Sequence, residues 1–187
     1  MGGTVIEIEE SIDVALPRER VFEFAARPEN MPLWNPVVQE SKALGDLEEG
    51  TEVVQRVDLF GRRFQTTYEV TCYEPNDRIV YTSRTGPVEV QGTMEFQRAK
   101  DGTRVRWSVA GDCRSLFRVA ESVLIGMGRP EMRTCLENLK GVLEQAEPGE
   151  DGEIAVYDRR IPVPAPSVIS QGRRLFSLVT SLVAQKS

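Results

Sequence analysis

The sequence has 187 residues, with 23 Lys and Arg against 29 Asp and Glu, and therefore a formal net charge of −6. This acidic balance argues against nucleic acid as the main partner, because neutralising phosphates requires a concentrated basic surface. The sequence contains no histidine, which excludes Ser-His-Asp and Cys-His catalysis and zinc sites with histidine ligands. We expect neither a metal nor a cofactor.

Cysteines and targeting signals predict the compartment. Cys72, Cys113 and Cys135 are odd in number and share no CxxC spacing, so they are interpreted as small buried hydrophobic residues. The first residues lack the basic region and the apolar core of a signal peptide. No apolar run reaches the roughly 20 residues of a membrane span. These features predict a cytoplasmic protein.

The chain begins with a predicted strand. Residues 4–14 alternate between apolar and polar side chains, which is typical of a strand with one wet face. Pro17 would stand at the first position of a helix that continues to Ala26, because its fixed φ suits that position. Prolines then interrupt the next nine residues around Trp34, where a short helix or turn is expected: Pro28, Pro32 and Pro36.

Residues 51–113 predict a meander of antiparallel strands. Asp101-Gly102 is a favourable two-residue hairpin turn, since both positions tolerate positive φ. A hairpin centred there gives three pairs on one face: Phe96 with Trp107, Met94 with Val109, and Gly92 with Gly111. The polar pairs Gln97 with Arg106 and Glu95 with Ser108 then occupy the other face. A slip by one residue would mix the two faces.

Gly61 predicts an earlier turn of the same kind. One face then carries Val53, Gln55, Val57 and Leu59 together with Phe64, Thr66, Tyr68, Val70 and Cys72. For residues 78–85 the pattern leaves two alternatives. Either Ile79, Tyr81 and Ser83 point inward, or Val80, Thr82 and Arg84 do.

Residues 115–146 predict one long helix, or two helices end to end, that covers the sheet. Apolar side chains recur at spacings of three and four through both halves. Gly126, Gly128 and Pro130 interrupt the pattern, so a kink or break is expected near residues 127–129.

The predicted inner face of the sheet is the candidate functional site. It combines large aromatic residues with an amide, a hydroxyl and glycines, a mixture typical of a small-molecule cavity. The predicted ligand-binding residues are Trp34, Gln55, Thr66, Tyr68, Met94, Phe96, Trp107, Val109, Phe117, Leu124 and Met127. Two alternatives stay open: the aromatic residues fill a packed core, and the polar groups meet water at strand ends. Trp34 could likewise gate the cavity or pin its loop to the core.

Several motifs carry a family resemblance over roughly residues 4–146. They are Val21-Phe22 with Pro28-Glu29 and Trp34, Glu69-Val70-Thr71 through Tyr73-Glu74-Pro75 with Arg78, Gly102-Thr103-Arg104-Val105, and Leu139–Glu144. In this order the chain resembles the START-like, or SRPBCC, superfamily, and more narrowly its polyketide cyclase/dehydrase and lipid-transport group. The resemblance implies an α+β helix-grip fold, a curved antiparallel sheet wrapped around a long C-terminal helix with an apolar cavity between them. Members bind lipids, sterols, hormones, quinones or polyketides, and a minority are enzymes.

Two functions from different classes follow. Residues 1–147 are predicted to form a domain that binds or carries a hydrophobic small molecule, without catalytic residues. The alternative is an aromatase/cyclase-type enzyme in which Tyr68, Tyr81, Gln55 and Thr66 orient carbonyls and a buried carboxylate moves protons. No adjacent acid–base pair supports this alternative, so a binding protein is favoured over an enzyme.

Residues 148–187 form a predicted C-terminal extension outside the resemblance. Residues 147–152 are typical of a flexible boundary and residues 161–166 of an extended proline-rich segment. Ser167 can cap an amphipathic helix that reaches about Lys186. This helix is expected to dock on its own domain or in a homodimer, so deleting residues 167–187 should lower solubility or break a dimer. A membrane surface is the less favoured partner, because the polar face carries few basic residues.

Overall fold

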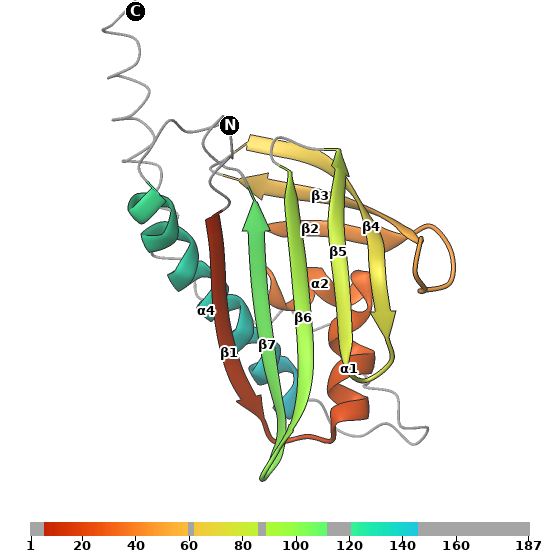
Figure 1. The fold of residues 1–187 in the computed structure, drawn as a ribbon, viewed down its shortest axis with the longest axis vertical. Coiled ribbons are helices and arrows are strands. Elements are labelled where there is room, and N and C mark those ends of the chain that lie inside the picture. Colours follow the sequence, from red (N-terminus) through yellow and green to blue (C-terminus); the bar gives the residue numbers. More distant parts are fainter. Residues whose placement is uncertain (1–5, 60–61, 86–88, 112–120, 146–187) are drawn as a thin grey trace, which may run out of the picture.

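The first strand of the chain lies beside the last one and closes a single curved sheet. The computed structural model describes residues 6–59, 62–85, 89–111 and 121–145. Seven antiparallel strands take the order β1-β7-β6-β5-β4-β3-β2, and Figure 1 shows α1 and α2 behind them and α4 along β1. The elements are β1 (Ile6–Val14), α1 (Arg18–Ala26), the short 3-10 helix η1 (Pro28–Asn30), α2 (Met31–Trp34), β2 (Val38–Ala43), β3 (Glu52–Leu59), β4 (Arg62–Glu74), β5 (Arg78–Thr85), β6 (Val90–Ala99), β7 (Gly102–Gly111) and α4 (Glu121–Gln145).

This architecture is the helix-grip fold that the sequence predicted. The strand at the N-terminus is confirmed, as is the helix after Pro17, although Pro17 lies just before the first helical residue instead of within the helix. The interrupted segment around Trp34 forms η1 and α2. The strand β2 was not predicted, because its pattern, Val38-Gln39-Glu40-Ser41-Lys42-Ala43, contains only two apolar residues.

The β6–β7 hairpin differs from the predicted register by two residues. Ala99 pairs with Gly102 around a Lys100-Asp101 turn, so Met94 lies opposite Trp107 and Gly92 opposite Val109. The reason lies at Gly102, which has a φ of 150° and approaches β1 so closely that a Cβ atom would stand 2.1 Å from the Val14 carbonyl oxygen. A shift of two preserves the side-chain period of a strand, so the predicted faces are confirmed: Phe96 and Met94 are buried and Gln97 is exposed.

The β3–β4 pairing is confirmed as far as Val70. Val53, Gln55 and Val57 lie opposite Tyr68, Thr66 and Phe64. Cys72 is the exception, because a bulge between Val70 and Cys72 shifts the register against β5 and brings Tyr73 to the core side. On β5 the first alternative holds, since Ile79 and Tyr81 are buried.

The long helix is continuous through its three poor helix residues. α4 runs from Glu121 to Gln145 with Pro130 inside it, so the predicted break is absent. The close packing against β1 explains why glycine is suited to this segment, because a Cβ atom at Gly128 would lie 2.5 Å from Ile8 Cδ1. Residues 115–120, residue 146 and the whole C-terminal extension lie outside the described residues.

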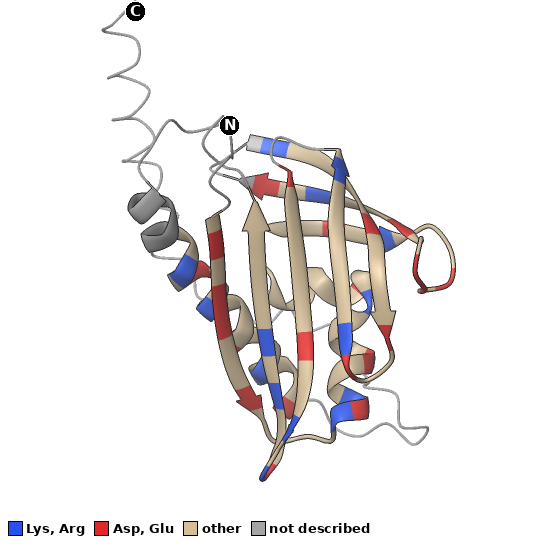
Figure 2. Ribbon diagram, viewed as in Figure 1, with Lys and Arg blue, Asp and Glu red and all other residues tan. Residues whose placement is uncertain are grey.

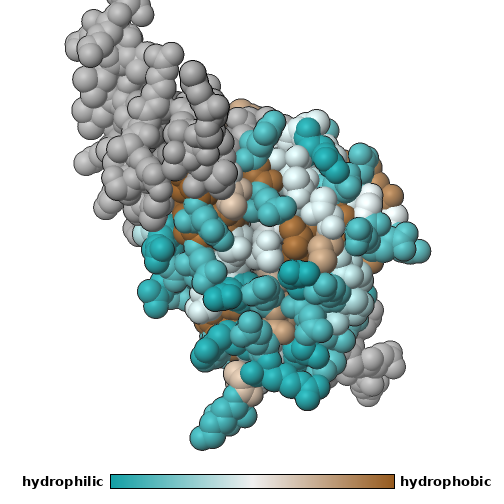
Figure 3. Space-filling view, viewed as in Figure 1, coloured by the Kyte–Doolittle hydropathy of each residue, from teal (hydrophilic) through white to brown (hydrophobic). Residues whose placement is uncertain are grey.

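The outer face of the sheet is a charged surface. Arg106 on β7 pairs with Glu9 on β1 at 3.1 Å and with Glu95 on β6 at 3.4 Å. Figure 2 shows acidic and basic residues distributed along these strands, and Figure 3 shows hydrophilic residues over much of the same side. Among the described helices, none is both long enough and apolar enough to cross a membrane. Because the outer face is charged, the candidate site for an apolar ligand belongs to the opposite, inner face.

Candidate functional site

The inner face of the sheet is fully buried at one end and half-buried at the other. On β7, Thr103 and Val105 have no exposed area, whereas Trp107 and Val109 are partly exposed. β6 repeats the gradient, because Phe96 and Met94 are 1% and 2% exposed while Gly92 and Val90 are partly exposed. We call the first region the hairpin end. The second, called the half-open end, consists of Ile8, Phe64, Tyr68, Ser83, Val90, Gly92, Trp107 and Val109.

Two helices seal the hairpin end. The Phe22 ring on α1 meets the Phe96 ring edge to face at 5.1 Å between centroids. The C-terminal half of α4 contributes Leu136, Leu139 and Leu143, each at most 1% exposed. Phe96 therefore belongs to a packed core and has no free surface for a ligand.

The short helix α2 crosses the inner face between the two regions. At its start, Gln55 Nε2 on β3 lies 3.0 Å from Met31 Sδ. At its end, the Trp34 ring lies 5.5 Å from the Trp107 ring on β7, with the planes at 83°. Asn138 Nδ2 on α4 donates a hydrogen bond to the Trp34 carbonyl at 3.2 Å. α2 thus forms a floor beneath the half-open end and is held from three sides.

Several polar groups of the inner face are already engaged within the protein. Gln55 Nε2 also donates to Ser41 Oγ at 3.1 Å. The Tyr81 hydroxyl donates to the Ala26 carbonyl at 2.7 Å, and burial raises the pKa of this phenol. Burial also raises the pKa of the Cys135 thiol to about 12, so this group stays protonated near neutral pH. These side chains are structural, and none is free to orient a substrate.

Two other buried groups, both at the inner face, lack a hydrogen-bond partner. Trp34 Nε1 and Thr66 Oγ1 are buried, in side chains that are only 1% and 3% exposed, and neither makes a hydrogen bond of acceptable geometry. Thr66 shares the inner face with Tyr68. Burial raises the pKa of the Tyr68 phenol, and the nearby Thr66 hydroxyl lowers it by a smaller amount. A buried polar group without a partner costs about 1–3 kcal/mol, so such groups mark sites that a ligand can complete.

The two glycines of the predicted inner face have separate roles. A Cβ atom at Gly92 would lie 3.9 Å from Trp107 Nε1, so the indole leans over the position where a larger β6 side chain would stand. At Gly111 a Cβ atom would meet the Glu89 carbonyl oxygen at 2.6 Å. Gly92 therefore leaves room at the half-open end, whereas Gly111 permits close backbone packing.

Charge is almost absent from the inner face. Glu10 is the one charged residue of β1 whose side chain lies on the inner face. Arg129 on α4 pairs with it at 3.6 Å. Glu131, also on α4, has its pKa raised by burial. Within the described part of the chain, no three His, Cys, Asp or Glu side chains gather as metal ligands would.

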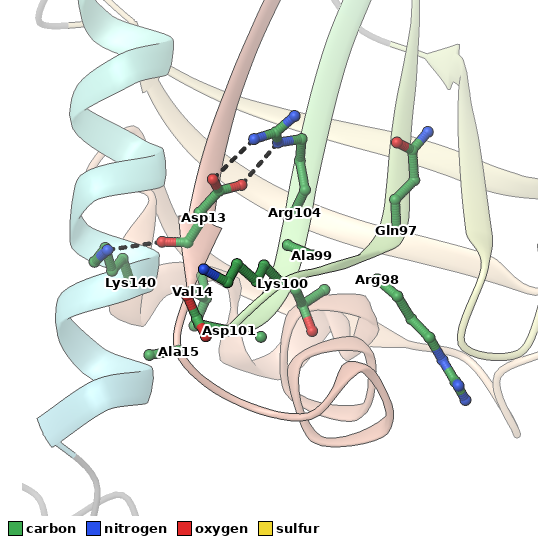
Figure 4. Close-up of a pocket in the computed structure, with 12 residues that line it drawn as sticks. Asp13, Val14, Ala15, Gln97, Arg98, Ala99, Lys100, Asp101, Arg104 and Lys140 are labelled. Atoms are coloured by element: carbon green, nitrogen blue, oxygen red, sulfur yellow. Dashed lines mark hydrogen bonds and ion pairs between the residues drawn. The ribbon is translucent and has the colours of Figure 1, made fainter.

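A pocket of about 430 Å³ lies elsewhere, beside the β6–β7 turn (Figure 4). Two of its basic side chains, Arg104 and Lys140, are bound to Asp13. Arg104 donates two hydrogen bonds to the Asp13 carboxylate at 2.7 and 2.9 Å, which lowers the Asp13 pKa. Lys140 Nζ donates to the Asp13 carbonyl at 2.7 Å. These contacts join the hairpin, β1 and α4, and we assign the pocket a structural role.

The predicted site residues fall into three groups. Gln55, Met94, Phe96 and Trp34 are buried among core residues. Tyr68, Trp107 and Val109 line the half-open end, and Thr66 lies on the same face. Phe117 and the side chains of Leu124 and Met127 lie outside the described residues. Ile8 and Met31 were not among the predicted site residues. The inward position of Ile8 follows from the alternation of β1, whereas the role of Met31 depends on contacts distant in sequence.

The sequence of the chain relates it to a known protein family. Residues 5–144 match the family model described as polyketide cyclase / dehydrase and lipid transport. The chain belongs to this family. The family assignment confirms the predicted resemblance and covers all the described strands, α1, α2 and nearly all of α4. No curated protein shows significant sequence similarity to the chain.

Several solved structures share the fold at low sequence identity. A START superfamily protein from Mycobacterium smegmatis is 16% identical with a TM-score of 0.65, over 74% of this chain and 97% of its own. The protein TTHA0849 from Thermus thermophilus is 18% identical with a TM-score of 0.60, over 74% of this chain and 97% of its own. The di-domain ARO/CYC protein StfQ of the steffimycin biosynthetic pathway is 16% identical with a TM-score of 0.62, over 75% of this chain and 51% of its own.

Proposed function

We propose that the protein binds a hydrophobic small molecule, of the lipid, quinone or polyketide kind, at the half-open end of the inner face. The main observation that supports this function is the gradient of burial along β6 and β7, from fully buried residues at the hairpin end to half-buried apolar residues beyond α2. Half-buried aromatic side chains beside a few polar groups are typical of small-molecule sites. Membership of a family that includes lipid transport supports the same function.

Binding without catalysis is the form we favour. The cyclase alternative requires free polar groups, but Tyr81 and Gln55 are held by Ala26, Ser41 and Met31. The ligand-binding unit in this proposal is residues 1–147, and residues 148–187 are an extension to it.

A neutral fluorescent probe tests the proposal. N-phenyl-1-naphthylamine should bind the full-length protein with increased, blue-shifted emission, and added apolar compounds should displace it. A ligand present at about 100 times its dissociation constant should stabilise the protein by about 2.7 kcal/mol, visible as a higher melting temperature. Absence of probe binding would count against the proposed function.

Gly92 provides a matched pair of variants that locates the site. Gly92→Leu places a side chain where the Trp107 indole leans, so probe binding should fall at least tenfold. Gly92→Ala adds only a Cβ atom 3.9 Å from Trp107 Nε1, an ordinary contact, and should bind as the wild type does. Equal binding by both variants, with both folded by circular dichroism, would place the probe elsewhere and contradict the proposed location.

A further inference from the structure

The two buried groups without partners at the inner face indicate what kind of ligand the site takes. Trp34 Nε1 is a hydrogen-bond donor only, so it can be satisfied only by an acceptor. Thr66 Oγ1 can donate or accept. Both side chains are nearly fully buried, and the other buried polar side chains of this region, Gln55, Ser41 and Tyr81, form hydrogen bonds within the protein.

A chain of contacts relates the two groups in space. Trp34 and Met31 lie one turn apart on α2, Met31 contacts Gln55, and Gln55 stands directly opposite Thr66 on the neighbouring strand. The half-buried side chains of Trp107, on β7, and Tyr68, on β4, lie on the same concave face.

The charges of the described inner face limit the ligand further. Glu10 is paired with Arg129. Arg98 stands at an inward position at the hairpin end of β6 and is paired with Glu19, whereas the residues that form the half-open end carry no charged side chain. An ionised group placed there would lose its hydration without gaining a counter-charge, at a large cost in free energy.

We propose, on the basis of the binding function above, that the ligand is uncharged and carries two separate polar groups, at least one of them a carbonyl-type acceptor. The Trp34 indole N–H donates to that acceptor, and the Thr66 hydroxyl contacts the second polar group. The apolar body between them lies against Trp107 and Tyr68. A rigid polycyclic diketone has this pattern, whereas a simple fatty acid or a hydrocarbon does not.

The test uses matched steroids as rigid probes in competition with N-phenyl-1-naphthylamine. The compounds are 5α-androstane-3,17-dione, the hydrocarbon 5α-androstane and the anion androsterone sulfate. The variants are Trp34→Phe, which removes the N–H and keeps an aromatic ring, and Thr66→Val, which removes the hydroxyl at nearly constant volume. Melting temperatures confirm that each variant is folded.

We expect each variant to weaken the dione about fivefold to tenfold, because each removes one buried hydrogen bond. The affinity of the hydrocarbon should be unchanged or higher in both variants, and the sulfate should compete at least tenfold less well than the dione. Should Trp34→Phe fail to fold, Thr66→Val gives the same comparison.

Three results would overturn the inference while leaving the binding function intact. They are equal effects of the variants on dione and hydrocarbon, competition by the sulfate as strong as that by the dione, and lack of competition by any steroid against a probe that does bind. If the probe itself does not bind, the proposed function fails first, and the two failures are therefore distinguishable.

Discussion

Trp34 and Trp107 meet edge to face, with ring centroids 5.5 Å apart and planes at 83°, although one belongs to the short helix α2 and the other to the strand β7. The pair differs in burial, since Trp34 is 1% exposed while Trp107 is only half-buried. This contact marks the boundary between the packed core and the half-open end. Edge-to-face aromatic pairs contribute about 0.5–1.5 kcal/mol beyond their buried area, which helps to hold α2 in place.

The position of this boundary predicts different effects for two aromatic truncations. Phe96→Ala, in the sealed core, should lower the free energy of unfolding by about 3–5 kcal/mol. Trp107→Ala should cost less, about 2–3 kcal/mol, because part of its ring has no protein contact to lose. Chemical denaturation measures both values. In the probe assay, Trp107→Ala should abolish binding, whereas Phe96→Ala should retain it under conditions where the protein is folded. The reverse order would mean that the boundary is misplaced.

Two buried threonines of the sheet predict opposite effects of the same substitution. Thr66→Val removes a hydroxyl without a partner, so the ligand-free protein should gain about 1 kcal/mol of stability. Thr103→Val removes a hydroxyl that donates to the Leu16 carbonyl at 2.8 Å, and should lose about 1–2 kcal/mol. Urea denaturation of the two variants makes the comparison. A loss of stability in Thr66→Val would show that this hydroxyl is satisfied within the protein.

Two glycines with nearly the same φ separate backbone strain from steric conflict. Gly45 has a φ of 148° and open space around it, whereas Gly102 has a φ of 150° and the Val14 carbonyl beside it. Gly45→Ala should therefore cost about 1–2 kcal/mol, the strain of a positive φ. Gly102→Ala should cost about 4 kcal/mol, because the β1–α1 connection must also move. Equal thermal shifts for the two variants would contradict the close approach of the hairpin to β1.

Burial of Cys135 predicts low reactivity and a dependence of stability on alkaline pH. Its pKa rises from an ordinary value of 9.0 to about 12, chiefly by burial. Between these values the unfolded chain loses the thiol proton and the folded protein keeps it, so the free energy of unfolding should fall as pH rises from about 9 to about 12. Cys135→Ala should flatten this part of the pH–stability profile.

The half-buried Cys72 serves as the internal control for the reactivity of Cys135. With a maleimide at pH 8, followed by peptide mass spectrometry, Cys72 should be labelled well before Cys135. Labelling of Cys135 as fast as Cys72 would show that the α2–α4 contact opens readily.

The alternation of side chains predicted the faces of the strands but not every pairing. A period of two assigned Met94, Phe96, Trp107 and Val109 to the inner face, and the structure confirms it. The exact hairpin register depended on Gly102, whose conformation serves a contact with β1 that lies far away in the sequence. The bulge before Cys72 leaves no mark in the pattern of polar and apolar residues.

The candidate site was less predictable than the fold, because hydrogen bonds between distant residues decide which polar groups are free. Gln55 and Thr66 stand opposite each other and have the same predicted role. In the structure Ser41 and Met31 satisfy Gln55, while Thr66 has no such partner. No local pattern distinguishes these two outcomes, since Ser41 belongs to the one strand that was not predicted.

The place of β1 beside β7 also has a consequence for biosynthesis. Ile6 pairs with Gly111, so β1, which is synthesised before the other strands of the sheet, cannot form its hydrogen bonds until the last strand, β7, has been made. Contacts between such distant parts of a chain slow folding. A strand with apolar residues that has not yet met its partner can pair with other chains instead. The outward side chains of β1, which include Glu7, Glu9 and Asp13, place negative charge along it. Mutual repulsion between copies of this strand would keep nascent chains apart until β7 arrives.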